Sequence, residues 1–413
     1  MRILEGAAAQ GYVRKLEQRG QTLGTLEPQV RRIIQRVRRE GDRRLRRYAE
    51  RWDGLRPGDP LRVPESEMQA ALDNSPRELR FALEEAAASI RSFCQWQKPA
   101  EWERAIRGRR LGQLLRPLSS VGCYVPGGRY PLPSTLLMTV IPAQVAGVKE
   151  IRVVSPRPAQ ATLAAAAALG VREFYRIGGA QAIATLAYGT KTIPRVDKIV
   201  GPGNLYVTTA KKIVAFDCAI DFLAGPTEGL ILCNDGDSSF IASDLVAQAE
   251  HDPEALVLLI TQSRKLARAV ARSVTSFARG NAIAQLSLRK HGAVLLAGSP
   301  QQAIDWTNRI APEHLTTTRE NLSSIVSAGS IFLGDYSAQA AGDYGSGPNH
   351  VLPTGGAARF RGGLSVLDFL KVITVQELSH RGLRKIAPSI VALAEAEGLR
   401  AHARSIQVRC GHA

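Results

Sequence analysis

Short apolar runs that end at glycine or proline alternate with alanine-rich stretches from residue 121 onward. Each run has the length of a buried strand, and each stretch that follows has the length and composition of a helix. Strand, tight turn and helix in repetition predict βαβ units on a mostly parallel sheet. The expected strands cover 151–156, 173–179, 196–203, 229–233, 255–261 and 292–298, and the expected helices cover 159–169, 180–188, 204–214, 264–277 and 300–310.

The two ends of the chain have a different pattern. Apolar positions recur near helical spacing over 25–52, 66–75 and 76–97, and the chain after residue 364 is also expected to be helical, with a break at Gly398. These changes predict four parts, which are a helical region over 1–120 that packs with 229–363, α/β units over 121–228 and 229–363, and a helical segment over 364–413.

The stretch from Ile241 to Glu254 predicts one amphipathic helix, with Ser238 and Ser239 as candidate N-caps. Gln248 and His251 are three residues apart, so on a helix they share a face. An amide oxygen and an imidazole nitrogen could then point at one spot, which is half of a metal site. Taken alone, such a pair is more often a solvated Gln and His at a polar helix end.

Three of the predicted strands end in glycine turns, which read YVPGG, GGAQ and GPGN. In a parallel sheet the carboxyl ends of the strands form the ligand crevice, and glycines there let backbone N–H groups approach an anion. Neither a GxGxxG fingerprint nor a P-loop is present. Any one turn alone is best explained as an ordinary βα turn, but the three together predict a nucleotide crevice. Their polar or aromatic members are Tyr124, Gln181 and Asn204.

In APEHL (311–315) an acid and an imidazole stand next to each other before a strand-like segment. If the chain is extended there, the side chains of Glu313 and His314 diverge, and the two would do different jobs rather than form a dyad. Either could act as a general acid or base once buried. A surface turn explains the motif equally well when it is taken alone.

Two further stretches contain carboxylates and histidines, AGDYGSGPNHVLPT and EGLRAHAR. The first is a loop dense in glycine and proline, where a carboxylate could complete a metal site or form an Asx-turn. The second is expected to be broken by its glycine, so its acid and histidine need not share a helix face. A histidine in such a place is most often solvated. The residues concerned are Asp343, His350, Glu397 and His402.

The charge of the chain raises nucleic-acid binding as an alternative. Its 413 residues include 54 Lys and Arg against 37 Asp and Glu, a formal charge of +17. The arginines are densest over 31–51, where acidic residues are interleaved and apolar positions lie near helical spacing, so a solvated helix face is expected. No zinc-finger spacing, RNP-like aromatic run or basic tail is present, and a nucleic-acid partner is therefore not favoured.

The remaining composition is that of an ordinary globular protein, with 45% hydrophobic and 22% charged residues. No apolar run is long enough for a membrane span, and the N-terminal stretch lacks the core of a secretory signal. Five scattered cysteines without a CxxC favour a reducing compartment. We therefore expect a cytoplasmic protein without a membrane partner.

Taken together, the motifs resemble those of the histidinol dehydrogenase family over residues 25–405. The resemblance implies an α/β fold of two tandem, incomplete Rossmann-like units with parallel-rich sheets, a helical N-terminal region and a helical C-terminal dimerisation arm. It also implies a homodimer and a zinc-dependent, NAD-linked, four-electron oxidation of histidinol through an aldehyde to histidine. The stretches that carry it, in family order, are GCYVPGGRYPLPSTLLMTVIPAQVAGV, GGAQAIATLAYGT, VGPGNLYV, AGPTE, DLVAQAEH, APEHL, GDYGSGPNHVLPT and EGLRAHA.

The same resemblance implies roles for residues of this chain. His314 would take the hydroxyl proton of the substrate, and Glu313 would activate the water that attacks the aldehyde. The segment that carries Glu397 and His402 would reach across to the partner subunit, so that the dimer is required for activity. The implied metal ligands, which also contact the substrate, are Gln248, His251, Asp343 and His402. The other implied substrate contacts are Thr227, Glu313, His350 and Glu397, and the implied NAD contacts are Tyr124, Gln181 and Asn204.

Two positions depart from the usual family pattern, Thr227 in place of Ser and Gly345 in place of Ala. The first keeps the hydroxyl group and the second should loosen the loop slightly. Paralogues that oxidise other small alcohols, such as sulfopropanediol, share the metal and base motifs and remain an alternative. The intact GDY, APEHL and EGLxAH motifs favour histidinol. A nucleic-acid-binding protein on an inactive enzyme frame is a remote alternative, because no site residue of the family is missing.

Overall fold

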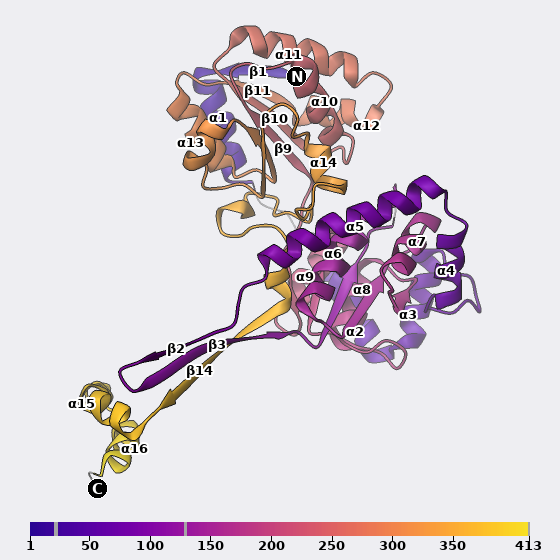
Figure 1. The fold of residues 1–413 in the computed structure, drawn as a ribbon. Coiled ribbons are helices and arrows are strands. Elements are labelled where there is room, and N and C mark those ends of the chain that lie inside the picture. Colours follow the sequence, from indigo (N-terminus) through magenta and orange to yellow (C-terminus); the bar gives the residue numbers. More distant parts are fainter. Residues whose placement is uncertain (20–23, 128–129, 412–413) are drawn as a thin grey trace. The chain divides into compact units, whose positions relative to one another are not determined.

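The computed structural model describes residues 1–19, 24–127 and 130–411. Contacts divide the chain into two units, whose helices and strands are drawn in Figure 1. Unit 1 comprises Met1–Gln97 and Ser119–Asp368, and unit 2 comprises Lys98–Leu118 and Phe369–Ala413. Within the described ranges, no helix is long and apolar enough to cross a membrane.

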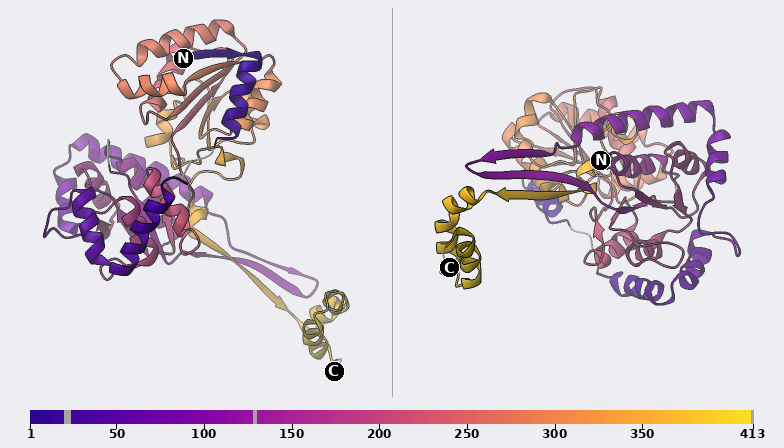
Figure 2. Two further views of the ribbon diagram at one scale, coloured as in Figure 1. Left: turned by 180° about the vertical axis from the view of Figure 1, so that it is seen from behind. Right: turned by 60° about the horizontal axis from the view of Figure 1, so that its bottom comes forward.

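One core of unit 1 is a six-stranded parallel sheet with the order β1-β11-β10-β9-β12-β13. Side chains alternate along a strand, so the two faces of the sheet pack against different helices. On one face, leucines of β9 and β10 pack against α1 and α13. On the other face, Ile231 of β9 and Leu259 of β10 pack against α10 and α11. Figure 2 shows α1, in indigo, beside the sheet. The strands are β1 (Arg2–Glu5), β9 (Glu228–Leu232), β10 (Leu256–Thr261), β11 (Ala293–Leu296), β12 (His314–Thr317) and β13 (Ser330–Leu333). The helices are α1 (Gly6–Glu17), α10 (Ser238–Ala249), α11 (Arg264–Phe277), α12 (Ala282–Lys290) and α13 (Pro300–Ile310).

A second parallel sheet in unit 1 has five strands in the order β6-β5-β4-β7-β8. Its strands β4 and β7 are almost wholly buried, as expected for a parallel sheet that is covered on both faces. The strands are β4 (Ser120–Tyr124), β5 (Glu150–Val154), β6 (Glu173–Tyr175), β7 (Lys198–Val200) and β8 (Ala219–Ile220). The helices between them are α6 (Pro133–Ala146), α7 (Gln160–Ala168), α8 (Gly179–Tyr188) and α9 (Leu205–Val214).

The N-terminal helices pack in two places. Helix α1 adjoins α13, whereas α2 packs against α8 and α9, α4 against α7, and α5 against α6. In α2 the apolar residues at helical spacing, Val30, Ile33, Ile34 and Val37, are buried, and the arginines between them are exposed, as the sequence predicted. These elements are α2 (Glu27–Glu40), α3 (Asp42–Tyr48), a π-helical turn (Ala49–Asp53), α4 (Glu65–Asp73) and α5 (Arg77–Gln97). The domain boundaries given above stay a prediction.

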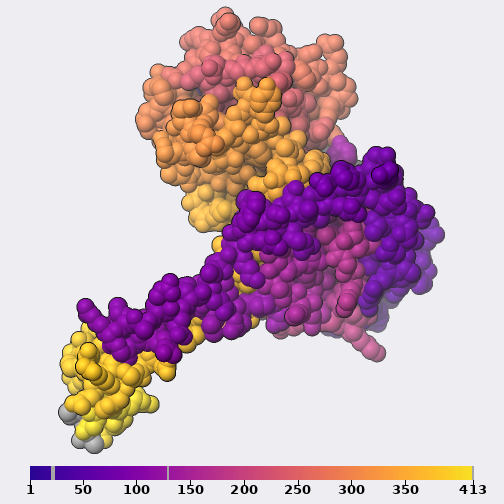
Figure 3. All heavy atoms as spheres, in the orientation of Figure 1, coloured from indigo at the N-terminus to yellow at the C-terminus, as the bar shows by residue number. Residues whose placement is uncertain are grey.

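Unit 2 is a three-stranded antiparallel sheet followed by two helices. Its strand order is β14-β3-β2, so a strand near the C-terminus pairs with one from the N-terminal third of the chain. Figure 3 shows these purple and yellow segments in contact. The elements are β2 (Trp102–Ile106), β3 (Arg109–Pro117), β14 (Leu370–Leu378), α15 (His380–Ala396) and α16 (Arg400–Gln407).

The mixed α/β class with parallel-rich sheets and helical N- and C-terminal regions is confirmed. Six strands were missed, namely β1, β2, β3, β8, β13 and β14. Strand β2 is exposed along its whole length and β14 along nearly all of it, so neither has the alternation that marks a half-buried strand. The glycine turn predicted at 124–128 ends at Gly128, outside the described residues.

The helix predicted over 241–254 is shorter at its C-terminal end and begins earlier. It is α10, which is capped by the Asp237 side chain rather than by Ser238 or Ser239, and which ends at Ala249. Pro253 disfavours helical geometry in the residue before it, so the chain leaves the helix before that point. His251 therefore lies in the turn after the helix and not on its face.

Candidate active site

A buried polar cluster lies where β9 and β12 begin. Glu313 immediately precedes β12 and His314 is its first residue, and His314 pairs in register with Gly229 of β9. The side chains of Glu313 and His314 are both more than nine-tenths buried. This is the amino end of the parallel sheet, opposite to the edge where ligand crevices of such sheets usually form.

His314 lies between two carboxylates. Its Nδ1 is 3.7 Å from Oε2 of Glu313, and its Nε2 is 3.7 Å from Oδ1 of Asp343. Burial alone would lower the pKa of His314, but the two neighbouring carboxylates outweigh it and raise the pKa. The side chains of Glu313 and His314 are thus close together and do not diverge fully as simple strand alternation suggests.

Glu313 is an acid whose pKa this environment raises. Burial raises the pKa of its carboxyl group to about 8, against the opposing effects of the His314 charge and of a hydrogen bond from the Glu228 backbone N–H. That N–H donates to Oε2 of Glu313 over 2.9 Å. A carboxyl group with a pKa near neutrality can act as a general acid or base.

Helix α14 (Gln339–Tyr344) and the loop after it carry two of the candidate residues, Asp343 and His350. His350 has Nδ1 2.9 Å from the backbone oxygen of Asp343 and Nε2 3.5 Å from Oγ1 of Thr135 in α6. Burial lowers the pKa of His350 and so favours its neutral form. Burial alone would raise the pKa of Asp343, but the hydrogen bond and charge of His314 hold it below its usual range. The segment is therefore fixed with a carboxylate facing an imidazole.

Gln248 is a buried amide at the end of α10 and is 1% exposed. Among the described residues, neither its Oε1 nor its Nε2 has a hydrogen-bond partner. A buried amide left in this state is costly, so it indicates that another group belongs beside it. The site is built for close approach here, because a Cβ on Gly229 would lie 2.9 Å from Cγ of Gln248 and 3.1 Å from Oε1 of Gln339.

His251 and Asp343 are the other candidate ligands near this part of the chain. His251 is exposed, and its charge is the smallest of the effects that act on the pKa of Asp343. Within residues 1–19, 24–127 and 130–411, no three His, Cys, Asp or Glu side chains form a group that could hold a metal ion. The amide oxygen of Gln248 is a ligand of another type that could take part in a metal site.

The other candidate residues lie elsewhere in the chain. Thr227 is partly buried just before β9, and its backbone oxygen accepts from the Leu256 N–H over 2.8 Å. Glu397 and His402 belong to unit 2, the first directly after α15 and the second in α16, and both are exposed.

A separate cavity of about 330 Å³ lies at the carboxyl ends of strands in the five-stranded sheet. All three residues predicted to contact a nucleotide, Tyr124, Gln181 and Asn204, line it. The Tyr124 hydroxyl accepts from the Gly179 N–H over 3.1 Å, and the Asn204 side chain caps α9. Residues of all three glycine turns thus line one cavity, and the binding of a nucleotide there stays a prediction.

Several residues of this cavity gave no signal in the sequence. Asp53 accepts hydrogen bonds of 3.0 Å from the Gly178 N–H and from Nε2 of Gln181, and burial raises its pKa to about 6. It ends a π-helical turn in the N-terminal region, 125 residues before Gly178. Only the tertiary fold brings it to the cavity, together with Trp52 and Arg157.

Parallel α/β sheets, a cavity at the strand ends and a buried carboxyl–imidazole cluster together define an α/β enzyme. The family model described as histidinol dehydrogenase matches residues 16–410. The chain therefore belongs to the histidinol dehydrogenase family, and it is an oxidoreductase.

Relatives and a solved structure agree with this assignment. The histidinol dehydrogenase of Methanothermobacter thermautotrophicus is 48% identical over 393 residues, which cover 91% of this chain and 92% of the relative. That of Aquifex aeolicus is 44% identical over 404 residues, with 95% of each chain covered. The crystal structure of histidinol dehydrogenase from Elizabethkingia anophelis superposes with a TM-score of 0.94 at 36% identity and covers 99% of this chain and 98% of that one.

Proposed function

We propose that this chain oxidises L-histidinol through L-histidinal to L-histidine, with NAD as the electron acceptor and with a zinc ion in the site. The observation that carries the proposal is the buried cluster itself, in which the unpartnered Gln248 amide accompanies an imidazole held between two carboxylates. The identity of the proposed substrate comes from the family, whose model matches residues 16–410.

The residues that would hold zinc are Gln248, His251 and Asp343, with His402 of the partner subunit. Two neutral nitrogens, one amide oxygen and one carboxylate are ligands that Zn²⁺ accepts. Ligation through Oε1 would satisfy half of the buried Gln248 amide. When bound, the metal supplies positive charge that holds the amino alcohol and polarises its oxygen.

His314 is the proposed base of the first oxidation. It would take the proton from the substrate hydroxyl group as a hydride leaves the same carbon for NAD. The two carboxylates beside its imidazole stabilise the charge that the ring then carries. Its burial keeps bulk water from competing for that proton.

Glu313 is the proposed base of the second oxidation. It would take a proton from the water that attacks the aldehyde carbon, and a second hydride would then leave for NAD. The hydrogen bond from the Glu228 N–H orients its carboxylate. In total, histidinol, water and two NAD⁺ give histidine, two NADH and three protons.

A cavity of about 400 Å³ beside the cluster has room for the substrate, and its lining includes His314, Phe332, Asn349 and His350. His350, Thr227 and Glu397 would help to hold the substrate, and Tyr124, Gln181 and Asn204 would contact NAD in the other cavity.

The test is to incubate purified, zinc-loaded protein with histidinol and NAD. Histidine and two NADH per histidinol are expected, together with about one zinc per chain by elemental analysis. If histidinol gave no NADH but another small alcohol did, the activity would be that of a paralogue.

A further inference from the structure

Lys211 and Asp221 form a buried ion pair near the cavity of about 330 Å³ that is proposed to bind NAD. None of the roles proposed above involves this ion pair. Their side chains are 2% and 1% exposed. Lys211 lies on α9, and Asp221 follows β8 directly. Withdrawing two charges from water is costly unless further hydrogen bonds complete their solvation, so the partners of this pair show what it does.

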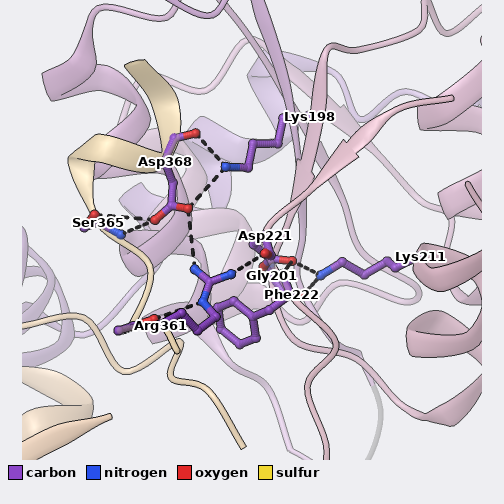
Figure 4. A network of polar contacts seen from close by, with 9 residues as sticks. Lys198, Gly201, Lys211, Asp221, Phe222, Arg361, Ser365 and Asp368 are labelled. Carbon is purple, nitrogen blue, oxygen red and sulfur yellow. Dashed lines mark hydrogen bonds and ion pairs between the residues drawn. The ribbon is translucent and has the colours of Figure 1, made fainter. Parts of the chain in front are cut away.

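Both members of the pair bind the same residue, Gly201. Oδ2 of Asp221 accepts from the Gly201 N–H over 2.7 Å, and Nζ of Lys211 donates to the Gly201 carbonyl oxygen over 2.9 Å. Figure 4 shows the carboxylate and the ammonium group converging on this glycine. The other oxygen of Asp221 accepts from the Phe222 N–H over 2.6 Å. The ion pair therefore holds both polar groups of one backbone residue.

Gly201 opens the GPGN turn that contributes to the cavity. Its φ of +110° suits glycine, and a Cβ there would lie 2.1 Å from the carbonyl oxygen of Tyr124. The backbone of Gly201 is thus in close contact with Tyr124 on one side and leads into Asn204 on the other. Both of these residues line the cavity, so a shift of Gly201 would move two of the three proposed NAD contacts.

Asp221 is itself anchored from the opposite side. Arg361 donates to the backbone oxygen of Asp221, and its guanidinium carbon lies 4.2 Å from the centre of the Phe222 ring. Arg361 also lies 3.5 Å from Asp368, which accepts from Lys198 at the start of β7. These contacts, drawn in Figure 4, connect the Lys211–Asp221 ion pair to β7, the strand that ends at the GPGN turn.

We propose that Lys211 and Asp221 are positioning residues for the nucleotide, because they hold Gly201 and, through it, Tyr124 and Asn204 in the geometry that binds NAD. The inference rests on the proposed function, in which NAD occupies this cavity. It assigns the pair no contact with NAD.

The test is to measure NAD binding by a double variant, Lys211→Met with Asp221→Leu, as zinc-loaded protein. Replacing a buried ion pair by apolar side chains of similar size is often neutral for stability, whereas removing one partner is not. The dissociation constant of NAD, measured by calorimetry, is expected to rise about tenfold, as for the loss of the hydrogen bonds to one residue. The dissociation constant of histidinol should not change.

A conservative variant and a matched control separate positioning from general stability. In Lys211→Met with Asp221→Asn, an amide oxygen can still accept from the Gly201 N–H, so part of the NAD affinity should return. The matched control is Arg152→Met with Glu173→Leu, which removes another ion pair from the same sheet. Its arginine is also buried, but the pair does not line the cavity, so NAD binding should not change.

A folded double variant with Lys211→Met and Asp221→Leu that binds NAD like the wild type would overturn the inference, even if it melted at a lower temperature. If that variant did not fold, the variant with Asp221→Asn decides, because its NAD affinity must lie below that of the wild type. Failure of the wild-type protein to bind NAD would overturn the proposed function as well. If Asn204→Ala lost NAD binding but the variants of Lys211 and Asp221 did not, only the positioning role of the ion pair would be overturned.

Discussion

At the scale of single residues, the acid–base chemistry centres on His314. Oxygen atoms of two carboxylates lie 3.7 Å from its two ring nitrogens. Such an imidazole gains a proton readily, and it can pass that proton on only where a neighbouring group or the solvent accepts it. The adjacent Glu313, with its pKa raised to about 8, is suited to a different step at the same place.

Substitutions of these two residues should therefore separate the two oxidations. His314→Asn is expected to slow the oxidation of histidinol by about 10²–10⁴-fold, the usual effect of losing a general base. Glu313→Gln should spare that step and slow the oxidation of histidinal. The rates of NADH formation from each compound, measured separately, test this. Unchanged oxidation of histidinal by Glu313→Gln would exclude its role in water activation.

Asp53 predicts a dependence of stability on pH. Burial raises the pKa of Asp53 to about 6, above that of the unfolded chain, so the folded state holds this proton more tightly. The contribution of Asp53 to stability is fully present below the unfolded pKa of about 4 and is lost as the pH rises through about 6.

In Asp53→Asn this loss should be absent, because the amide keeps an acceptor for Gly178 and Gln181 but does not ionise. The free energy of unfolding of the variant, relative to that of the wild type, should rise by about 3 kcal/mol between about pH 4 and about pH 7. Urea denaturation of both proteins across this range measures it. A difference that is constant with pH would mean that Asp53 ionises as in the unfolded chain.

At the scale of elements, the site depends on how closely β9 and α10 approach. The connection between them returns α10 so that its C-terminal end, with Gln248, lies over the start of β9. Gly229 permits this approach, because it places no side chain between the strand and the two glutamines, Gln248 and Gln339. The geometry of the proposed metal ligand is thus set by a residue that is not a ligand.

Gly229→Ala should therefore weaken zinc binding. Its methyl group would lie 2.9 Å from Cγ of Gln248 and would push the amide from its place. A higher dissociation constant for zinc, from competition with a chelator, is the expected result. Gly11→Ala is the control and should not affect zinc, because a Cβ there would meet no described residue within 4 Å apart from its own helix. Equal zinc affinity in the wild type and both variants would mean that Gln248 tolerates displacement or is not a ligand.

At the scale of the whole molecule, two proposed site residues, Glu397 and His402, belong to a different unit from the other candidates. Both are exposed, the first at the end of α15 and the second on α16. The proposed homodimer gives these exposed groups a function, since each site would receive them from the neighbouring subunit.

Mixed dimers test this arrangement. His314→Asn and His402→Ala are each expected to be inactive as homodimers. A dimer of one subunit of each kind would contain one site with both native residues and should have about half the activity of the wild type. Co-expression with two affinity tags isolates this species. Activity no higher than that of the parents would show that His402 serves its own subunit.

The mixed α/β class, the parallel-rich sheets and the placing of three glycine turns around one cavity could be predicted from the sequence. Each of these depends on local information, namely the period of apolar positions and the residues that tight turns require. Where that information was weak, as in the exposed strands β2 and β14, the prediction failed.

Only the tertiary structure decided which distant residues meet. It brought Asp53 to Gln181, Lys211 and Asp221 to Gly201, and His314 to Asp343. It also placed the buried carboxyl–imidazole cluster at the amino end of its sheet. These contacts join residues that are between 10 and 128 positions apart in the chain, and their free energy depends on burial and on partners that no local pattern of amino acids specifies.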